Sequence, residues 1–301
     1  MTQERRMIVV AGATGDLGGR IVRELAALGA PVAALVRPGT APGRLADLPA
    51  EARLVDFART EALASALGDA ACVVSALSGL EPVILDTQGR LLDAAVATGV
   101  PRFIPSDFAI DFRKLPPGTN RNLDLREAFR TRAEAAQIRL TSVLNGAFMD
   151  MLTGTIPIIQ HGLRRVLYWG SADQPMDFTT IADTAAYTAR AAMDPDSPRV
   201  LNICGARVSA RDIAAAVGRV RGKRYGLLPA GTIGTLGLTI GVARKLAPGG
   251  ADEIYPAWQG MQYMRNLFAG EGMLGTPFDN DRYPGTIVTS LEDVLRSDPR
   301  P

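Results

Sequence analysis

Three glycines near the N-terminus have the spacing of a nucleotide-binding turn. Gly12, Gly15 and Gly18 fall at every third position of GATGDLGG, residues 12–19, between an apolar run and an amphipathic helical pattern. A strand, a tight turn and a helix are the context that a dinucleotide fingerprint requires. Gly12 would permit the turn, Gly15 would let the backbone approach a pyrophosphate, and Gly18 would let the helix pack close to the strand. The positively polarised N-terminus of the helix would also present backbone N–H groups to phosphate. Thr14, Asp16 and Leu17 lie in this segment and are further candidates for cofactor binding. A glycine-rich turn without a ligand is the alternative.

The residue after the second apolar run decides between the two nicotinamide cofactors. An acidic side chain there would bond the ribose 2'-hydroxyl, whereas an arginine would pair with the 2'-phosphate of NADP(H). This residue is Arg37, the segment at residues 36–40 contains no carboxylate, and Arg44 adds a second positive charge nearby. The sequence therefore predicts NADP(H) rather than NAD(H). Two objections stay open, because Arg37 could be a solvated cation and Asp16 places a negative charge near the expected phosphate.

Few other side chains in this sequence have the chemistry for catalysis. The single histidine, His161, rules out a His-rich metal site and a Ser-His-Asp triad. Cys72 and Cys204 lie in apolar runs, which is typical of buried core residues, so we expect no metal. His161 is the one side chain whose unperturbed pKa lies near neutrality, which makes it a candidate proton donor, with Tyr168 beside it in a substrate site. A hydrogen-bonded structural histidine is the alternative.

Short apolar strands alternate with helical patterns through the first half of the chain. We expect strands at residues 6–11, 31–36, 52–55, 71–77, 102–105 and 140–144. We expect helices at residues 17–28, 85–98 and 122–137. Strands buried on both faces and joined by helices form parallel sheets. The sequence therefore predicts an α/β fold with a Rossmann-type, doubly wound parallel sheet.

Beyond Asn145 this alternation ends, since glycine and proline become more frequent. Residues 1–150 are predicted to form an NAD(P)-binding Rossmann domain, to which residues 177–204 return. Residues 151–176 and 205–301 are predicted to form a smaller, discontinuous α/β domain that binds the substrate. Beyond Asn145 we expect helices at residues 181–193, in the returning segment, and at residues 210–220 and 252–269. The uncharged residues 225–243 contain several glycines and a proline, so we expect a buried helix or loop near the substrate rather than a membrane span.

The composition of the chain narrows the class of protein. Its 301 residues are 47% hydrophobic and 21% charged, with a formal net charge of +2. This is ordinary globular composition, and its 33 basic residues form no stripe, which argues against a disordered chain and against a nucleic-acid binder. The charged N-terminus lacks the apolar segment of a signal peptide. We expect a cytoplasmic protein that acts on a small molecule, without a membrane partner, and a homodimer is left open.

Together these motifs resemble the NmrA-like, isoflavone-reductase-like family of atypical short-chain dehydrogenases. The G-x-x-G-x-x-G spacing, Val36-Arg37, Val55-Asp56-Phe57 and above all RFIPSDF at residues 102–108 carry the resemblance. It implies that the cofactor would be contacted by three groups of residues. The adenine would lie between Asp56 and Phe57. The ribose and pyrophosphate would be lined by Ser75, Ala76 and Leu77. The nicotinamide would be approached by Pro105, Ser106 and Asn145. Strand-end packing, and a turn role for Asp56, are the alternatives.

The resemblance also implies a proton-handling lysine on the helix that precedes the last strand of the first half. This chain has Arg126 at that position, and it has no Tyr-x-x-x-Lys pair. An arginine is not deprotonated in a protein, so Arg126 could hold a carbonyl or carboxylate but could not act as a base. A solvated helix cation is the alternative for Arg126.

The sequence leaves three functional hypotheses open. The first is an NADP(H)-dependent reductase that transfers hydride to a small quinone, enone or aromatic carbonyl substrate. The second is a non-catalytic NADP(H)-binding regulator that senses redox state, which the missing lysine favours. The third is a cofactor-assisted isomerase or cyclase of a biosynthetic pathway.

Overall fold

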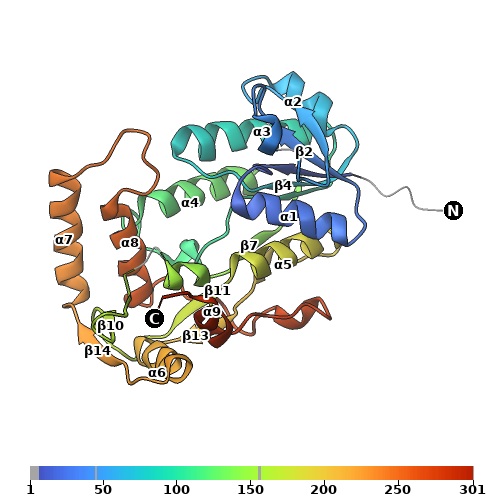
Figure 1. Ribbon diagram of the computed structural model, residues 1–301. Helices are drawn as coiled ribbons and strands as arrows, with labels where there is room; N and C mark the ends of the chain where they lie inside the picture. The colour runs from blue at the N-terminus through green and yellow to red at the C-terminus, as the bar shows by residue number, and fades with distance from the viewer. Residues whose placement is uncertain (1–6, 45, 155–156, 301) are drawn as a thin grey trace.

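A six-stranded parallel sheet forms the centre of the first half of the molecule (Figure 1). The structure is a computed structural model, which describes residues 7–44, 46–154 and 157–300. The strands of the sheet are β1 (Met7–Ala11), β2 (Val32–Val36), β3 (Glu51–Leu54), β4 (Ala70–Ser75), β5 (Arg102–Ile104) and β6 (Arg139–Leu140). Their order, β3-β2-β1-β4-β5-β6, is that of a doubly wound dinucleotide-binding sheet, so the predicted Rossmann-type fold is confirmed.

Helices cover both faces of this sheet because alternate residues of each strand point to opposite sides. On one face, Ile8 and Val10 of β1 pack with α1 (Asp16–Ala27) and α5 (Ile181–Met193). On the other face, Val9 and Ala11 pack with the helices α2 (Thr60–Leu67), α3 (Gln88–Ala97) and α4 (Arg121–Glu134). A π-helical turn, Pro82–Thr87, leads into α3. Burial on both faces explains why β1, β2 and β4 appear as continuous apolar runs in the sequence, whereas the edge strand β3 is mostly exposed.

Three contacts bring the later segment around α5 back to the first half. The helix α5 packs against α1, as Figure 1 shows, and Arg102 of β5 donates hydrogen bonds to the carbonyls of Ala191 and Ala192 at the end of α5. The strand β12 (Val200–Asn202) pairs in parallel with β7 (Ser142–Leu144). These contacts support the expected return of residues 177–204, while the boundaries of the two domains stay a prediction.

The second half contains two small sheets that share a second apolar core. One sheet has the order β14-β10-β9, from Gly226–Pro229, Arg165–Tyr168 and Ile159–Gln160. The other has the order β13-β11-β8, from Ala206–Val208, Met176–Thr179 and Ala147–Phe148. The helices of this half are α6 (Ala210–Arg221), α7 (Ile233–Leu246), α8 (Ala257–Phe268) and α9 (Leu291–Ser297). Short 3-10 turns lie at Pro42–Arg44, Phe112–Lys114, Met149–Thr153 and Asn280–Arg282.

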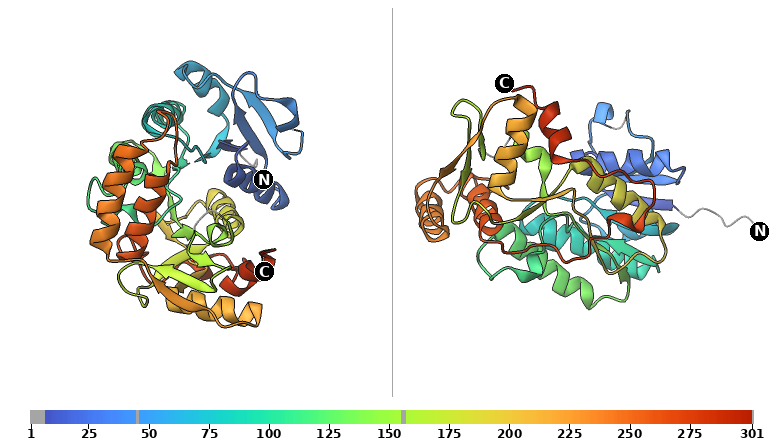
Figure 2. Two further views of the ribbon diagram at one scale, coloured as in Figure 1. Left: turned by 60° about the vertical axis from the view of Figure 1, so that its left-hand side comes forward. Right: turned by 90° about the horizontal axis from the view of Figure 1, so that it is seen from below.

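The helix α7 lies at the outer edge of the molecule, with α8 beside it (Figure 2). Leu236 and Ile240 are buried, but Leu238 and Leu246 are 74% and 81% exposed. The expectation of a buried segment at residues 225–243 is therefore wrong for most of α7, because only the side of α7 that meets α8 is covered. Among the described residues, no helix combines the length and apolar character needed to cross a bilayer.

Candidate cofactor and substrate site

The glycine turn between β1 and α1 has the geometry that the sequence predicts. Gly12 has φ +80°, and a Cβ added there would lie 2.5 Å from the carbonyl oxygen of Ala76. A Cβ on Gly18 would collide with the carbonyl of Gly12, so α1 can approach β1 only with glycine at this position. A Cβ on Gly15 would meet only the Gly12 carbonyl, at 3.3 Å. The protein itself therefore requires glycine at positions 12 and 18, whereas Gly15 keeps free the space above the turn.

The N-terminus of α1 is suited to an anion because no side chain caps it. Its N-cap residue is Gly15, which is exposed, and no side-chain hydrogen bond reaches the first turn. Five other helices, α4 to α7 and α9, have side-chain caps from Asn120, Thr180, Ser209, Thr232 and Ser290, whereas α2, α3 and α8 lack one as α1 does; α1 differs from these in following the glycine turn. The first N–H groups of a helix need partners, and phosphate is an effective one. The residues present, including Thr14 and Leu17 beside the turn, thus fit a pyrophosphate.

The charges around the expected 2'-phosphate favour an anion. Arg37 is exposed, and its guanidinium has no hydrogen bond or ion pair among the residues that the structure describes. Arg44 is exposed as well. Asp16, the charge that could oppose a phosphate, forms an ion pair with Arg20 at 2.7 Å. The objection from Asp16 is therefore weakened, since Arg20 compensates its charge.

The residues expected around the adenine serve as turn residues in this structure. Asp56 is exposed, and its Oδ1 accepts a hydrogen bond of 2.9 Å from the backbone N–H of Ala58. The carbonyl of Phe57 accepts a hydrogen bond from Arg90. This arrangement holds the Asp56 and Phe57 turn just beyond β3, and the contact with adenine stays a prediction.

The ends of β4 and β5 are joined by Ser106. Its Oγ donates to the carbonyl of Leu77 at 2.6 Å, and its N–H donates to Gln88. Leu77 follows Ala76, the residue that the Gly12 turn approaches. Ser106, which follows buried Pro105, thus connects the glycine turn with the segment where the nicotinamide is expected.

Two residues expected to line the cofactor are enclosed by protein. Ser75 and Asn145 are 0% exposed, and within the described residues their side-chain polar atoms have no hydrogen-bond partner. Buried polar groups without partners are costly. Direct contact between Asn145 and a nicotinamide would require neighbouring side chains to move, so this role stays a prediction.

Arg126 lies at the carboxyl edge of the sheet, as the resemblance implies. Its Nε donates to the carbonyl of Ser106 at 2.9 Å, and its Nη1 donates to the carbonyl of Asn122 at 3.1 Å. The side chain is partly buried, so Arg126 is not simply a solvated helix cation. Its charge is fixed beside the ends of β4 and β5, and the Nη2 group has no partner among the described residues.

Two tyrosines from the second half approach the same place, and the sequence analysis did not identify either. The hydroxyl of Tyr255 lies 3.4 Å from the Oγ of Ser78, just beyond Leu77. Tyr263 of α8 contacts Asn122. Burial raises the pKa of the Tyr263 phenol, while the positive charge of Arg126 opposes this shift. The expected helix over 252–269 contained both residues, but only the hydrogen bonds between residues 120–122 and residues 254–266 show that they come close to the helix that carries Arg126.

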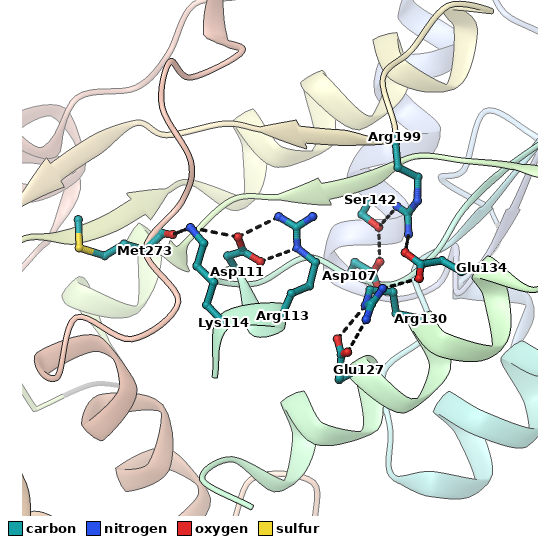
Figure 3. A network of polar contacts seen from close by, with 10 residues as sticks. All are labelled: Asp107, Asp111, Arg113, Lys114, Glu127, Arg130, Glu134, Ser142, Arg199 and Met273. Atoms are coloured by element: carbon teal, nitrogen blue, oxygen red, sulfur yellow. Dashed lines mark hydrogen bonds and ion pairs between the residues drawn. The ribbon is translucent and has the colours of Figure 1, made fainter. Parts of the chain in front are cut away.

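A network of polar contacts holds the RFIPSDF segment, which contains Ser106, the residue that Arg126 contacts (Figure 3). Asp107 accepts a 2.5 Å hydrogen bond from Ser142 of β7, and Ser142 accepts one from Arg199. Burial raises the pKa of Asp107, against the Ser142 hydrogen bond and the nearby arginine charges. Arg199 also contacts Glu134 of α4, which pairs with Arg130. The network joins β5, β7 and α4, the elements that hold Ser106 and Arg126.

His161 lies in the turn that follows β9, Tyr168 ends β10, and both side chains have other contacts. The Nδ1 of His161 is 3.0 Å from the hydroxyl of Tyr225, and its Nε2 is 3.4 Å from Asp298. Burial lowers the pKa of His161, and the charge of Arg300 adds to this effect. Tyr168 packs on the core of the second half. No contact among the described residues joins either side chain to Arg126, so their catalytic roles stay predictions without support from the geometry.

The described residues offer no group of three or more His, Cys, Asp or Glu side chains able to hold a metal ion. Cys72 and Cys204 are free and buried, as expected. Burial raises the pKa of the Cys72 thiol to about 11, and it raises that of Cys204 to about 12. Both cysteines are therefore protonated core residues near neutral pH.

The sheet order, the glycine turn and the uncapped α1 define a dinucleotide-binding α/β protein of Rossmann type. The chain belongs to the NmrA-like family, whose model matches residues 4–232, so the resemblance is confirmed. It is 32% identical to pinoresinol reductase 1 of Arabidopsis thaliana over 217 residues, 66% of this chain and 67% of the relative.

Solved structures share the fold along almost the whole chain. One, described as AtPrR2 with NADP+ and (+)pinoresinol, has a TM-score of 0.81 and 21% identity, covering 98% of this chain and 99% of that one. Another, a leucoanthocyanidin reductase and NADPH complex from Vitis vinifera, has a TM-score of 0.77 and 19% identity, covering 96% and 98%.

Proposed function

We propose that the protein is an NADP(H)-dependent reductase that transfers hydride to a small aromatic substrate. The substrate would be a quinone, an enone or an aromatic carbonyl, in which carbon accepts hydride while negative charge develops on oxygen. The bound cofactor would supply the hydride, and the protein would supply binding, orientation and electrostatics.

The observation that carries this proposal is the fixed position of Arg126 next to the dinucleotide turn. A continuous series of contacts runs from Gly12 to Ala76, from Leu77 to Ser106, and from Ser106 to Arg126. A preorganised cation stabilises an oxyanion in the transition state more than it stabilises the neutral substrate. Arg126 would therefore lower the barrier without exchanging a proton.

Two further observations support the cofactor and the substrate class. The uncapped end of α1 would bind the pyrophosphate, and Arg37 would bind the 2'-phosphate. Several similar relatives are named as pinoresinol or pinoresinol-lariciresinol reductases, and two of the similar solved structures are described with NADP+ or NADPH.

The second candidate is a non-catalytic regulator that binds NADP(H) and reports redox state. The observation that favours it is Arg126 itself, because an arginine cannot take over the proton handling of the lysine that the family resemblance implies. A turnover measurement separates the two candidates.

The test is the oxidation of NADPH by the full chain with a panel of quinones, enones and aryl aldehydes. We expect turnover with at least one aromatic member of the panel. Gly15→Val is the matched control, because a Cβ at this position would meet only the Gly12 carbonyl, at 3.3 Å, which a small shift relieves, but it would occupy the position of the pyrophosphate. This variant should fold normally and lose both NADPH binding and turnover. Tight NADPH binding without turnover of any panel member would instead support the regulator.

A further inference from the structure

The reductase proposed above lacks an evident proton donor, since the expected lysine is replaced by Arg126. Hydride addition to a carbonyl leaves a basic oxyanion that must be protonated. Efficient general acids lie within hydrogen-bond reach of that oxygen. Candidates are therefore groups that carry a proton at neutral pH and lie next to Arg126.

The helix α8 is joined by hydrogen bonds to the start of α4, the helix that carries Arg126. The side chain of Asn120 accepts a 2.8 Å hydrogen bond from Gln259 of α8 and donates to Asn266, also of α8. The N–H of Arg121 donates to Gln262. These amide contacts fix one side of α8 against the first turn of α4, and Tyr263 lies on that side between Gln259 and Asn266.

The surroundings of Tyr263 place its phenol at the candidate site. Its phenol interacts with the side chain of Asn122, whose backbone carbonyl accepts from Arg126, and the charge of Arg126 acts on it, as do Tyr255 and Arg121. Arg126 is in turn held on the carbonyl of Ser106.

Tyr255, which is 58% exposed, reaches the end of β4 from the second half. Its hydroxyl meets Ser78, which follows the Leu77 carbonyl bonded by Ser106. Contacts therefore link the ends of β4 and β5 and the first turns of α4 to the segment at residues 255–263, which brings Tyr263 and Tyr255 to the part of the molecule that holds Arg126.

Resting on the proposed function, we propose that Tyr263 is the catalytic acid of the reaction, with Arg126 as its electrostatic partner. The carbonyl carbon accepts a hydride, with both its electrons, from the reduced nicotinamide, and the C=O π bond breaks. The electron pair moves to oxygen, and the phenolic proton of Tyr263 passes to that oxygen, which yields the alcohol. Arg126 stabilises the tyrosinate until a solvent proton restores the phenol. The balance is one carbonyl, one NADPH and one proton consumed, and one alcohol and one NADP+ formed.

Substitution of Tyr263 by phenylalanine tests the proposal, because it removes only the hydroxyl. Tyr263→Phe should lower kcat for an aryl aldehyde by about 100-fold or more, with NADPH affinity unchanged. The loss should be much smaller for a quinone, whose product oxyanion is phenol-like, with a pKa near ~10, and needs little help from an acid. Tyr283→Phe is the matched control, since Tyr283 is also half-buried and also loses one hydrogen bond, to Asp194. It should leave both rates unchanged.

A second measurement does not depend on activity. In the protein without cofactor, tyrosinate absorbance is followed as pH rises. Arg126→Met should move the titration of one tyrosine to higher pH, and this shift should be absent when Tyr263→Phe is also present.

Three results would overturn the assignment of Tyr263. They are wild-type aldehyde turnover in Tyr263→Phe, equal losses for aldehyde and quinone, and an Arg126→Met titration identical to that of the parent protein. A parent protein that reduces no panel member would contradict the reductase itself, which is a different outcome.

Discussion

At the scale of single residues, positive charge at the expected cofactor site is not neutralised by protein groups. Many arginines of this chain are paired with carboxylates, for example Arg20 with Asp16 and Arg207 with Asp177. Arg37 has no such partner among the described residues, and Arg126 is bonded only to backbone carbonyls. Unpaired guanidinium groups keep their donors free for phosphate or for an oxyanion.

The Arg37 side chain should account for most of the preference for NADPH over NADH. Arg37→Ala should reduce the difference in binding free energy between the two cofactors by about 1–3 kcal/mol, the range for charge-assisted hydrogen bonds. Titration calorimetry with both cofactors measures this difference. Arg224→Ala is the control, because it removes an equal charge from an exposed position in the second half. Equal NADPH and NADH affinities in the parent protein would contradict the assignment of Arg37.

At the scale of elements, the contact between α1 and β1 depends on a residue without a side chain. A Cβ at position 18 would collide with the Gly12 carbonyl, which belongs to backbone that cannot move without displacing the turn. The same residue type has no such role at position 241 of α7, where an added Cβ would meet nothing within 4 Å.

Alanine substitutions at these two glycines should therefore have opposite effects on stability. Gly18→Ala should lower the free energy of unfolding by more than ~2 kcal/mol, as overpacked sites do, and weaken NADPH binding. Gly241→Ala should raise the free energy of unfolding by about 0.5–1 kcal/mol, because alanine is the better helix former. Chemical denaturation measures both changes. A Gly18→Ala variant as stable as the parent would show that α1 can move away without cost.

The elements also show how far the sequence alone leads. The strands of the six-stranded sheet, the glycine turn and α5 were predictable because burial and turn geometry act through neighbouring residues, although the strand expected at 140–144 is divided into β6 and β7, and the short strands of the two small sheets were not predicted. The exposure of α7 was not predictable, because an uncharged helical sequence does not indicate whether one side of the helix or both sides will be covered by other elements. Tyr263 and Tyr255 were missed because they lie far from Arg126 in the sequence. Only the hydrogen bonds between the start of α4 and α8, and between Tyr255 and Ser78, bring them to the site.

At the scale of the whole molecule, one buried carboxylate lies where the segment after β5 meets the loop that follows α8. Asp111 has a side chain that is 1% exposed, and it pairs with Arg113 at 2.6 Å and Lys114 at 3.3 Å (Figure 3). Lys114 also donates to the carbonyl of Met273 at 2.6 Å, and the Asp111 N–H donates to the carbonyl of Gly272. The segment after β5 is thereby tied to the residues that follow α8, the helix that carries Tyr263.

The charge of Asp111 makes this connection sensitive to acid. Burial raises the pKa of Asp111, but the hydrogen bond from Arg113 and the charges of Arg113 and Lys114 outweigh burial, so the net pKa is lowered. A carboxylate with a depressed pKa in the folded state stabilises the fold above its unfolded pKa. This contribution is lost as pH falls below about 4, the ordinary aspartate value, toward the lower pKa of the folded state.

Asp111→Asn should therefore lower the free energy of unfolding at neutral pH by about 1–3 kcal/mol, because it removes a charged acceptor from two cations. It should also flatten the decline in stability between neutral pH and acid, since the titrating group is gone. Asp173→Asn is the matched control: its ion pair with Arg211 is exposed on both sides and screened by solvent, so its loss should change the free energy of unfolding much less. Denaturation curves recorded across this pH range compare the three proteins. If Asp111→Asn and the parent lose stability in parallel as pH falls, other carboxylates control the acid response, and the connection through Lys114 to Met273 does not depend on the charge of Asp111.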